Sequence, residues 1–284
     1  MQWLGRRESS NVEDRRGFSG GGLVAGGGII GIIIYLLSTF LGGGNVDPSQ
    51  LPQVSPQTQQ TTLTPEEEKA DNERAKFVKV VLAETEDVWN KVFADNGSTY
   101  TEPTLVLFRD GVASACGNAS AASGPFYCPQ DGKLYIDLSF YQEMQDKLNA
   151  PGDFAMAYVI AHEVGHHVQN LMGTASKVNR LRAQSGEKEA NRYSVAMELQ
   201  ADFYAGVWAH YDDKMKNILD AGDIDEAMNA ANAIGDDRLQ KRSTGVVVPD
   251  AFTHGTSAQR MYWFKKGYET GDLKQGNTFN DPGL

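Results

Sequence analysis

Three residues within a five-residue stretch have the types and spacing needed to bind a metal ion and hydrolyse a bond. His162, Glu163 and His166 follow the pattern H-E-x-x-H within I-A-H-E-V-G-H-H-V-Q-N-L. On a helix of about 3.6 residues per turn, the two imidazoles lie one turn apart on one face and can bind zinc together. Glu163 is rotated by about 100° from His162 and can reach the open side of the metal as a general base. His167 lies one position off this face, and we interpret it as a solvent-facing or supporting histidine.

The motif supplies two metal ligands, whereas a catalytic zinc commonly has three protein ligands and a water. Glu198 and Asp202 lie four residues apart on one face of an otherwise largely apolar stretch. An exposed acidic pair is the ordinary explanation of such spacing, because Asp and Glu are mostly exposed. Beside an incomplete H-E-x-x-H site, however, we predict that Glu198 is the third ligand. Asp202 is then placed to accept the free ring N–H of a ligating histidine.

The neighbouring sequence predicts the elements that must hold these residues. Asp153 follows Pro151-Gly152 as a helix N-cap, and an apolar run free of proline continues to Gly173, so the motif falls on a buried helix. Apolar periodicity predicts other helices at 65–94, 140–148, 187–211, 224–242 and 257–269, with a polar interval through residue 185. Short β-rich runs predict strands at 104–109, 112–116 and 133–138. The fold class is therefore α+β, predominantly helical, with a small β-sheet packed on the motif helix.

Composition excludes some functions. The 284 residues carry a formal net charge of −11, with 40% hydrophobic residues. A chain of this length and apolar content can bury a full core. Nucleic acids and anionic lipid surfaces reward clustered Lys and Arg, so the charge argues against them as partners of the main domain.

The N-terminal part reads as a membrane anchor. Residues 23–41 contain no charged residue, and the length of this stretch is close to the roughly 20 residues that span a bilayer. The run is longer than the roughly 7–15 apolar residues of a signal peptide, so we favour an uncleaved transmembrane helix. Four arginines precede it within residues 1–22, where we expect no fold, and the positive-inside rule places that segment in the cytoplasm. Residues 42–64 are rich in Gly, Pro, Gln, Ser and Thr and form a predicted disordered tether to a domain over 65–284.

Two cysteines, Cys116 and Cys128, are separated by a turn-rich stretch. They could form a disulfide, half of a zinc site or two unrelated thiols. An extracytoplasmic main domain makes the disulfide the favoured state.

These motifs also carry a family resemblance. H-E-V-G-H-H at 162–167 followed by E-L-Q-A-D at 198–202 resembles the gluzincin pattern, H-E-x-x-H with a downstream E-x-x-x-D. More narrowly, the chain resembles the bacterial "putative neutral zinc metallopeptidase" family. The matching stretches are W-L-G-R-R-E-S-S-N-V-E-D-R-R-G near the start, G-P-F-Y-C-P at 124–129, Y-I-D-L-S-F at 135–140 and F-T-H-G-T-S-A-Q-R at 252–260. The resemblance implies a zincin-like domain anchored in the bacterial inner membrane.

A second resemblance concerns His254. The segment from His254 to Arg260 is similar to the H-P-x-x-x-x-R segment of membrane-associated gluzincins, although Gly255 stands here where those proteins have proline. The resemblance implies that His254 stabilises the oxyanion of the transition state. The alternatives are a loop histidine that caps a helix and, for Arg260, a structural charge partner.

From these residues we predict a membrane-anchored zinc endopeptidase. Zinc bound by His162, His166 and Glu198 activates a water that attacks a peptide carbonyl of a protein substrate, with Glu163 as the base. The alternative is a membrane-tethered binding or scaffold domain whose zinc is structural. A closed structural site normally has four protein ligands, and the glutamate beside the ligands favours catalysis.

Overall fold

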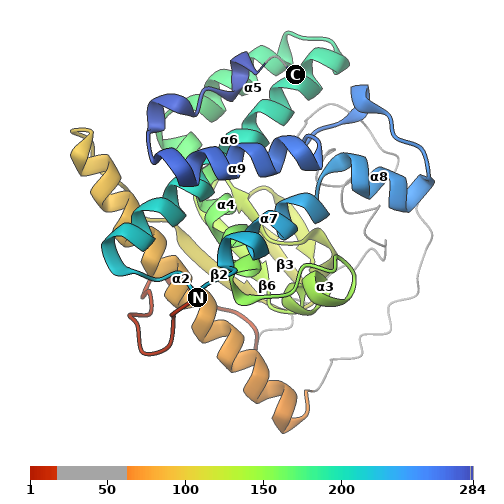
Figure 1. Cartoon of the computed structure of the whole chain (residues 1–284). Helices are drawn as coiled ribbons and strands as arrows, with labels where there is room; N and C mark the ends of the chain where they lie inside the picture. Colours follow the sequence, from red (N-terminus) through yellow and green to blue (C-terminus); the bar gives the residue numbers. More distant parts are fainter. Residues whose placement is uncertain (18–62, 282, 284) are drawn as a thin grey trace.

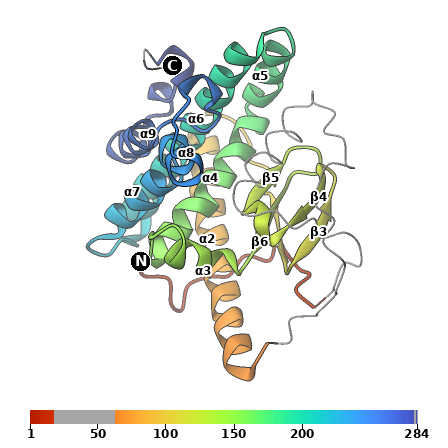
Figure 2. The same ribbon diagram turned by 90° about the vertical axis from the view of Figure 1, so that its right-hand side faces the viewer.

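The computed structural model describes residues 1–17, 63–281 and 283. Its central element is helix α4 (Asp153–Leu171), which lies between a small β-sheet and a group of helices (Figure 2). The sheet is formed by β1 (Val12–Asp14), β2 (Thr104–Phe108), β6 (Lys133–Asp137) and β5 (Phe126–Cys128), in that order. Strands β1, β2 and β6 are parallel, and β5 runs antiparallel to β6 at the edge. The prediction of an α+β fold with a small sheet is confirmed.

Helices supply the rest of the core (Figure 1). The remaining α-helices are α2 (Pro65–Asp95), α3 (Phe140–Asp146), α5 (Thr174–Ala183), α6 (Glu187–Lys216), α7 (Asp223–Ala233), α8 (Asp236–Thr244) and α9 (Ser257–Thr270). Short 3₁₀ turns are η2 (Ala121–Ser123), η3 (Pro249–Ala251), η4 (Leu273–Gln275) and η5 (Thr278–Asn280). A hairpin of β3 (Gly111–Ser114) and β4 (Gly117–Ser120) stands beside the main sheet.

Two glycines allow α6 and α9 to cross in close contact. A Cβ atom on Gly206 would lie 2.0 Å from the carbonyl oxygen of Phe264, and one on Gly267 would lie 2.1 Å from that of Phe203. Only glycine permits this backbone approach. The crossing fixes α9 on the helix that carries Glu198, and it thereby brings Arg260 toward the motif helix.

Two element predictions were wrong in extent. The predicted helix 224–242 is broken into α7 and α8 at Gly235, whose backbone is extended (φ −69°, ψ 142°). The Asp236 carboxylate then accepts backbone amide hydrogen bonds from Thr253 and His254 in a distant loop. The polar interval before residue 185 contains α5. The short strand predicted at 112–116 is confirmed as β3, which pairs with β4 in a separate hairpin.

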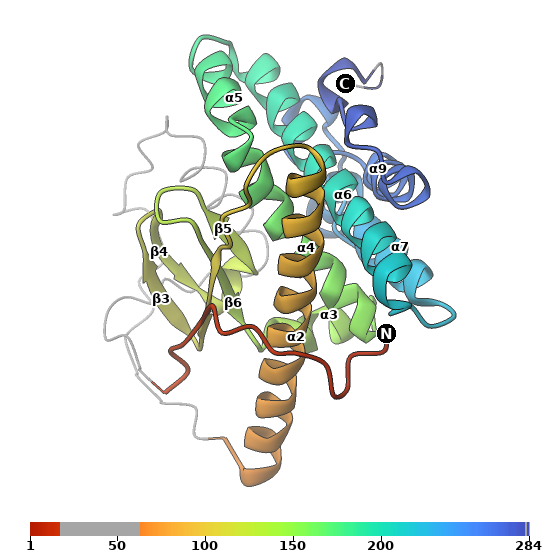
Figure 3. The same ribbon diagram turned by 90° about the vertical axis from the view of Figure 1, so that its left-hand side faces the viewer.

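The expectation that the first 22 residues have no fold is wrong for the described residues 1–17. Strand β1 pairs in parallel with β2, through backbone bonds that include Leu105 N to Asn11 O at 2.8 Å. Arg7 forms ion pairs with Glu86 at 2.9 Å and with Asp87 at 2.7 Å on α2. Figure 3 shows this segment, in red, crossing α2 toward the sheet. The folded domain therefore includes the N-terminal residues.

The predicted transmembrane helix 23–41 and most of the predicted tether 42–64 lie outside the described residues. Within residues 1–17 and 63–281, no helix has both the length and the apolar character needed to cross a bilayer. The β1–β2 pair has a separate consequence, because its two strands must lie on the same side of any membrane. This pairing does not fit a topology that puts residues 1–17 and the main domain on opposite sides.

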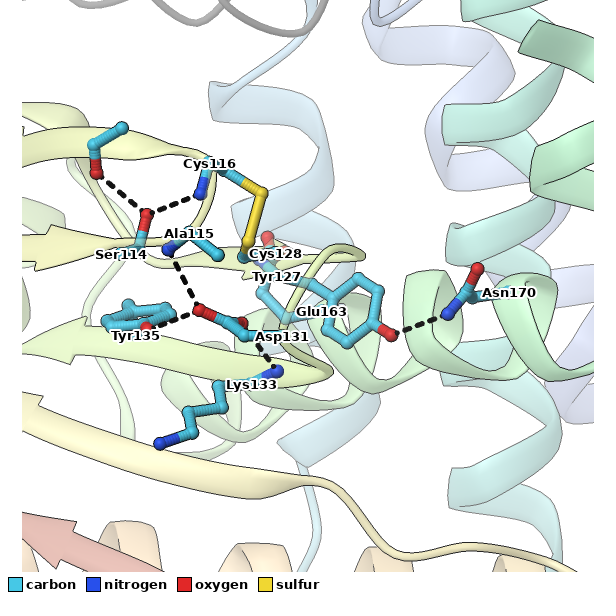
Figure 4. The surroundings of a disulfide bond; sticks show 11 residues. Ser114, Ala115, Cys116, Tyr127, Cys128, Asp131, Lys133, Tyr135, Glu163 and Asn170 are labelled. Atoms are coloured by element: carbon cyan, nitrogen blue, oxygen red, sulfur yellow. Dashed lines mark hydrogen bonds between the residues drawn. A yellow bond between two sulfur atoms is a disulfide. The ribbon is translucent and has the colours of Figure 1, made fainter.

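Cys116 and Cys128 are joined by a disulfide (Figure 4). The bond fastens the β3–β4 hairpin to the edge strand β5, which lies against α4. Among the described residues there is no free cysteine.

Candidate metal centre

Two helices bring the three predicted ligands together. His162 and His166 lie one turn apart on α4, and Glu198 reaches them from α6. The Nε2 atom of His162 is 3.2 Å from one Glu198 carboxylate oxygen, and that of His166 is 3.4 Å from the other. One ligand atom from each residue lies within 4.8 Å of the others. Two imidazole nitrogens and a carboxylate facing a common point are a donor set that suits zinc, so the residues fit this ion.

The close approach of the two helices depends on Gly165, which lies inside the motif. A Cβ atom there would be 2.9 Å from the carbonyl oxygen of Ala201 on α6. Real Cβ atoms do not approach a backbone oxygen this closely without displacing it, so a larger residue would push α4 from α6. The glycine therefore sets the distance between the histidines and Glu198.

A fully buried ionic network holds the first histidine. Asp202 has 0% exposure, and its Oδ1 lies 2.7 Å from Nδ1 of His162. Arg260 on α9 donates to both Asp202 oxygens, from Nε at 2.8 Å and from an η nitrogen at 2.9 Å. The Tyr158 hydroxyl also donates to Asp202. Burial raises the pKa of Asp202, but the charges of Arg260 and His162 lower it more, so the carboxylate stays ionised. It can thus keep the proton of His162 on Nδ1 and leave Nε2 free for a metal.

Gln169 supports the second histidine and was missed by the sequence analysis. Its Oε1 is 2.9 Å from Nδ1 of His166, and its Nε2 donates to the backbone oxygen of Met197 at 2.7 Å. The side chain is fully buried. Its position three residues after His166, on the same helical face, was a signal that could have indicated this role.

Glu163 lies beside the ligand cluster on the side of strand β5. Its carboxylate accepts a hydrogen bond from the backbone N–H of Tyr127 at 2.8 Å. Burial raises the pKa of Glu163 by more than the neighbouring histidines lower it. A carboxylate with a raised pKa is a better proton acceptor near neutral pH.

His167 does not face solvent. It is buried, with Nε2 at 2.7 Å from the backbone oxygen of Thr101 and Nδ1 at 3.1 Å from the Tyr127 hydroxyl. Asn170 donates to the same hydroxyl at 3.0 Å (Figure 4). These contacts fix Tyr127, whose backbone amide holds Glu163. His167 is therefore a support for the strand that positions the predicted base.

His254 lies on the loop before α9 and lines the cavity that also contains His162, His166 and Glu198. Its Nδ1 lies 3.1 Å from the Oδ1 of Asp236. Burial lowers the pKa of His254, but the hydrogen bond and charge of Asp236 and the charge of Glu198 raise it more, against a smaller opposing effect of Arg260. Sequence reasoning missed Asp236 because it fell inside the predicted helix 224–242, where an acidic residue is ordinarily exposed.

We predict a change in the pH profile when Asp236 is replaced. The raised pKa keeps the His254 imidazolium protonated above its ordinary range, so activity that needs this proton is lost as pH rises through the raised pKa. Asp236→Asn retains an acceptor for the loop amides but removes the charge. The alkaline limb of the kcat/KM profile should move to lower pH, while the acid limb, which we expect Glu163 to set, should stay in place. Stopped-time peptide assays across pH 5 to 10 measure this, and an unmoved alkaline limb would exclude His254 as its source.

The ligand cluster opens into a cavity of about 300 Å³. Its walls come from the β3–β5 region, α4, α5, α6 and the loop that carries His254. Most of the lining side chains are apolar, with a few charged groups near the ligands, as in many binding sites for organic ligands.

An H-E-x-x-H helix, a glutamate from a second helix and a cavity beside them define the class of zinc metallopeptidase sites. The chain belongs to the family described as "putative neutral zinc metallopeptidase", whose model matches residues 1–279. It is 51% identical over 291 residues to the uncharacterized protein YpfJ of Escherichia coli K12, covering 98% of this chain and 99% of that protein. It is also 45% identical over 191 residues to the uncharacterized protein Rv2575 of Mycobacterium tuberculosis H37Rv, covering 64% of each chain. No solved structure matches.

Proposed function

We propose that this protein is a zinc-dependent endopeptidase with a zincin-like catalytic domain. The observation that carries the proposal is the convergence of His162, His166 and Glu198 with Glu163 beside them, next to an open cavity. A closed structural zinc site would normally need a fourth protein ligand. The group of described residues that could hold a metal at this point contains three.

In this mechanism each residue has one task. His162, His166 and Glu198 would hold zinc, and zinc when bound supplies Lewis-acid chemistry. Glu163 takes the proton of the attacking water and delivers it to the leaving amine. His254, kept protonated by Asp236, donates a hydrogen bond to the oxygen on which negative charge develops.

The edge strand β5 supports an extended peptide as the substrate. It is the last strand of its sheet, and Phe126 and Tyr127 line the cavity beside Glu163. An extended chain can pair with such an edge through main-chain hydrogen bonds. Such pairing would bring a peptide carbonyl past the three ligands.

We predict that removal of zinc abolishes cleavage without unfolding the domain. The large apolar core does not depend on the ligand cluster, so the apo protein should remain folded. The purified protein is treated with 1,10-phenanthroline, dialysed and assayed on casein and on a quenched-fluorescent peptide mixture. We expect a loss of at least about 100-fold, consistent with the loss of a catalytic metal, and recovery on adding one equivalent of zinc.

The same experiment tests the scaffold alternative. Circular dichroism melting is recorded before and after chelation. A structural zinc would give a strong fall in Tm with no cleavage at any stage, and that result would overturn the peptidase assignment.

We also propose that the catalytic domain is extracytoplasmic and that residues 23–41 attach it to the bacterial inner membrane by entering and leaving the bilayer on the same side, without crossing it. The Cys116–Cys128 disulfide supports this side, because disulfides persist in oxidising compartments. The β1–β2 pair supports placing residues 1–17 on that side too. Cysteines introduced singly at the exposed Glu8 and Lys188 should then both react with a membrane-impermeant maleimide in whole spheroplasts. Labelling of neither would place the domain in the cytoplasm.

A further inference from the structure

One cation in the catalytic cavity has unused hydrogen-bond donors. Arg182, on α5, lines the cavity that also contains Glu198 and His254. Its Nε atom is buried and has no hydrogen-bond partner. No ion pair is formed by its side chain with any part of the chain that the structure describes. Burial lowers its pKa, but a guanidinium remains protonated in proteins.

The neighbouring charged groups of the cavity are occupied. Arg260 is bound to both oxygens of Asp202, and His254 is bound to Asp236. Glu163 accepts from the Tyr127 amide. None of these carboxylates contacts Arg182. The charge of Glu198 raises the pKa of Arg182, but the Glu198 carboxylate lies on His162 and His166 and forms no ion pair with Arg182.

A buried donor without a hydrogen-bond partner destabilises a protein, and more so when the group is charged. A guanidinium presents its N–H groups as a planar fork that matches the two oxygens of a carboxylate. The cavity around it is mostly apolar, so a charged acceptor there would be weakly screened. A ligand that brings a carboxylate into the cavity would satisfy these donors.

We propose that Arg182 binds a carboxylate of the peptide substrate beside the scissile bond. The proposal rests on the proposed peptidase function and specifies its substrate class: peptides that place an acidic side chain, or their own C-terminal carboxylate, in this cavity. Because the chain has a formal net charge of −11, general electrostatic attraction does not draw such peptides in. Selection then depends on the local contact with Arg182.

The test uses N-terminally fluorescein-labelled octapeptides of Ala, Phe and Leu. One Glu or its neutral counterpart Gln is placed at each position in turn, and every peptide is made as the free acid and as the C-terminal amide. Binding is measured by fluorescence anisotropy on the zinc-loaded protein carrying Glu163→Gln, so that hydrolysis is not required. The Glu-to-Gln arm detects a side-chain carboxylate, and the acid-to-amide arm detects the chain terminus.

We expect about tenfold weaker binding when one carboxylate is neutralised, as for loss of a hydrogen bond to a charged group. Adding Arg182→Gln should reduce the ratio of the two dissociation constants, neutral peptide over carboxylate peptide, to about one. Arg182→Lys should restore part of this ratio, because lysine keeps the positive charge but lacks the planar pair of N–H donors. The matched control is Arg180→Gln, an exposed arginine on the same helix outside the cavity lining, which should preserve the ratio.

The proposal is overturned if no arm shows a difference, or if Arg182→Gln leaves the difference unchanged. Hydrolysis by the wild-type protein is assayed separately with the same peptides. Absence of all cleavage alongside Arg182-dependent carboxylate binding would refute the peptidase function and leave the binding site standing. Cleavage with no preference for a carboxylate would refute the role proposed for Arg182 and leave the peptidase function standing.

Discussion

Glu163→Gln should lower kcat/KM for peptide hydrolysis by about 100- to 10,000-fold, the usual contribution of a positioned general base. The amide that replaces the carboxylate cannot take a proton from water at neutral pH. It can still accept the hydrogen bond that Tyr127 N donates to Glu163, and the ligands are untouched. Zinc content and Tm should therefore remain at wild-type values while activity is lost.

Zinc is measured by atomic absorption and activity by progress curves on the peptide mixture used for the chelation experiment. Glu189→Gln is the matched control, since it makes the same chemical change on an exposed residue of α6. It should retain activity within about twofold, as expected for a surface substitution. Equal rates for wild type and Glu163→Gln, at equal zinc content, would show that Glu163 is not the base.

Asp202→Asn should produce the largest loss of stability. The change leaves the Arg260 guanidinium, which is 2% exposed, without its carboxylate. Removing one partner of a buried ion pair costs about 3–5 kcal/mol of unfolding free energy. Zinc affinity should fall by about 10- to 100-fold, because His162 loses the carboxylate that orients its ring. Urea unfolding of the zinc-free protein gives the first quantity and competition with a zinc-binding dye gives the second.

A double variant separates these two effects. Asp202→Asn with Arg260→Met removes the unpaired charge and fills its volume with an apolar side chain. It should recover at least half of the lost unfolding free energy, since apolar replacements of buried ion pairs are often neutral. Zinc affinity should stay low, because asparagine provides no charge to His162. A single Asp202→Asn variant with wild-type stability would contradict the ionic network as described.

The chemistry of the site could be predicted from the chain because it is encoded locally. The spacing of His162 and His166 and that of Glu198 and Asp202 follow the helical repeat, and helices form from nearby residues. Both pairs therefore appear on their expected faces on α4 and α6. The same reasoning predicted α2, whose capping box at Thr64 and Glu67 is visible in the sequence and present in the structure.

Supporting contacts between distant elements could not be predicted in this way. Asp236 looks like an ordinary exposed acid within the predicted helix 224–242 until the loop of His254 packs against it. Arg182 lies in a stretch that looked like a polar interval, and its unpaired Nε becomes notable only once packing places it in the cavity wall. Residues 1–17 looked unstructured because β1 has only three residues, and these form a strand only by pairing with the distant strand β2.

The sequence by itself thus determined the donor atoms of the proposed zinc site, the predicted base and the predominantly helical α+β class. The tertiary structure decided which side chains hold those atoms in place and which remain available to a substrate. The physical reason is that helical periodicity and ligand spacing are properties of neighbouring residues. The burial of a side chain and its hydrogen-bond partners depend on which distant segments of the chain pack against it. Arg260 and Arg182 show the difference. In the sequence they are two arginines 78 residues apart, with nothing to distinguish their roles. Packing pairs Arg260 with Asp202 and leaves Nε of Arg182 without a hydrogen-bond partner.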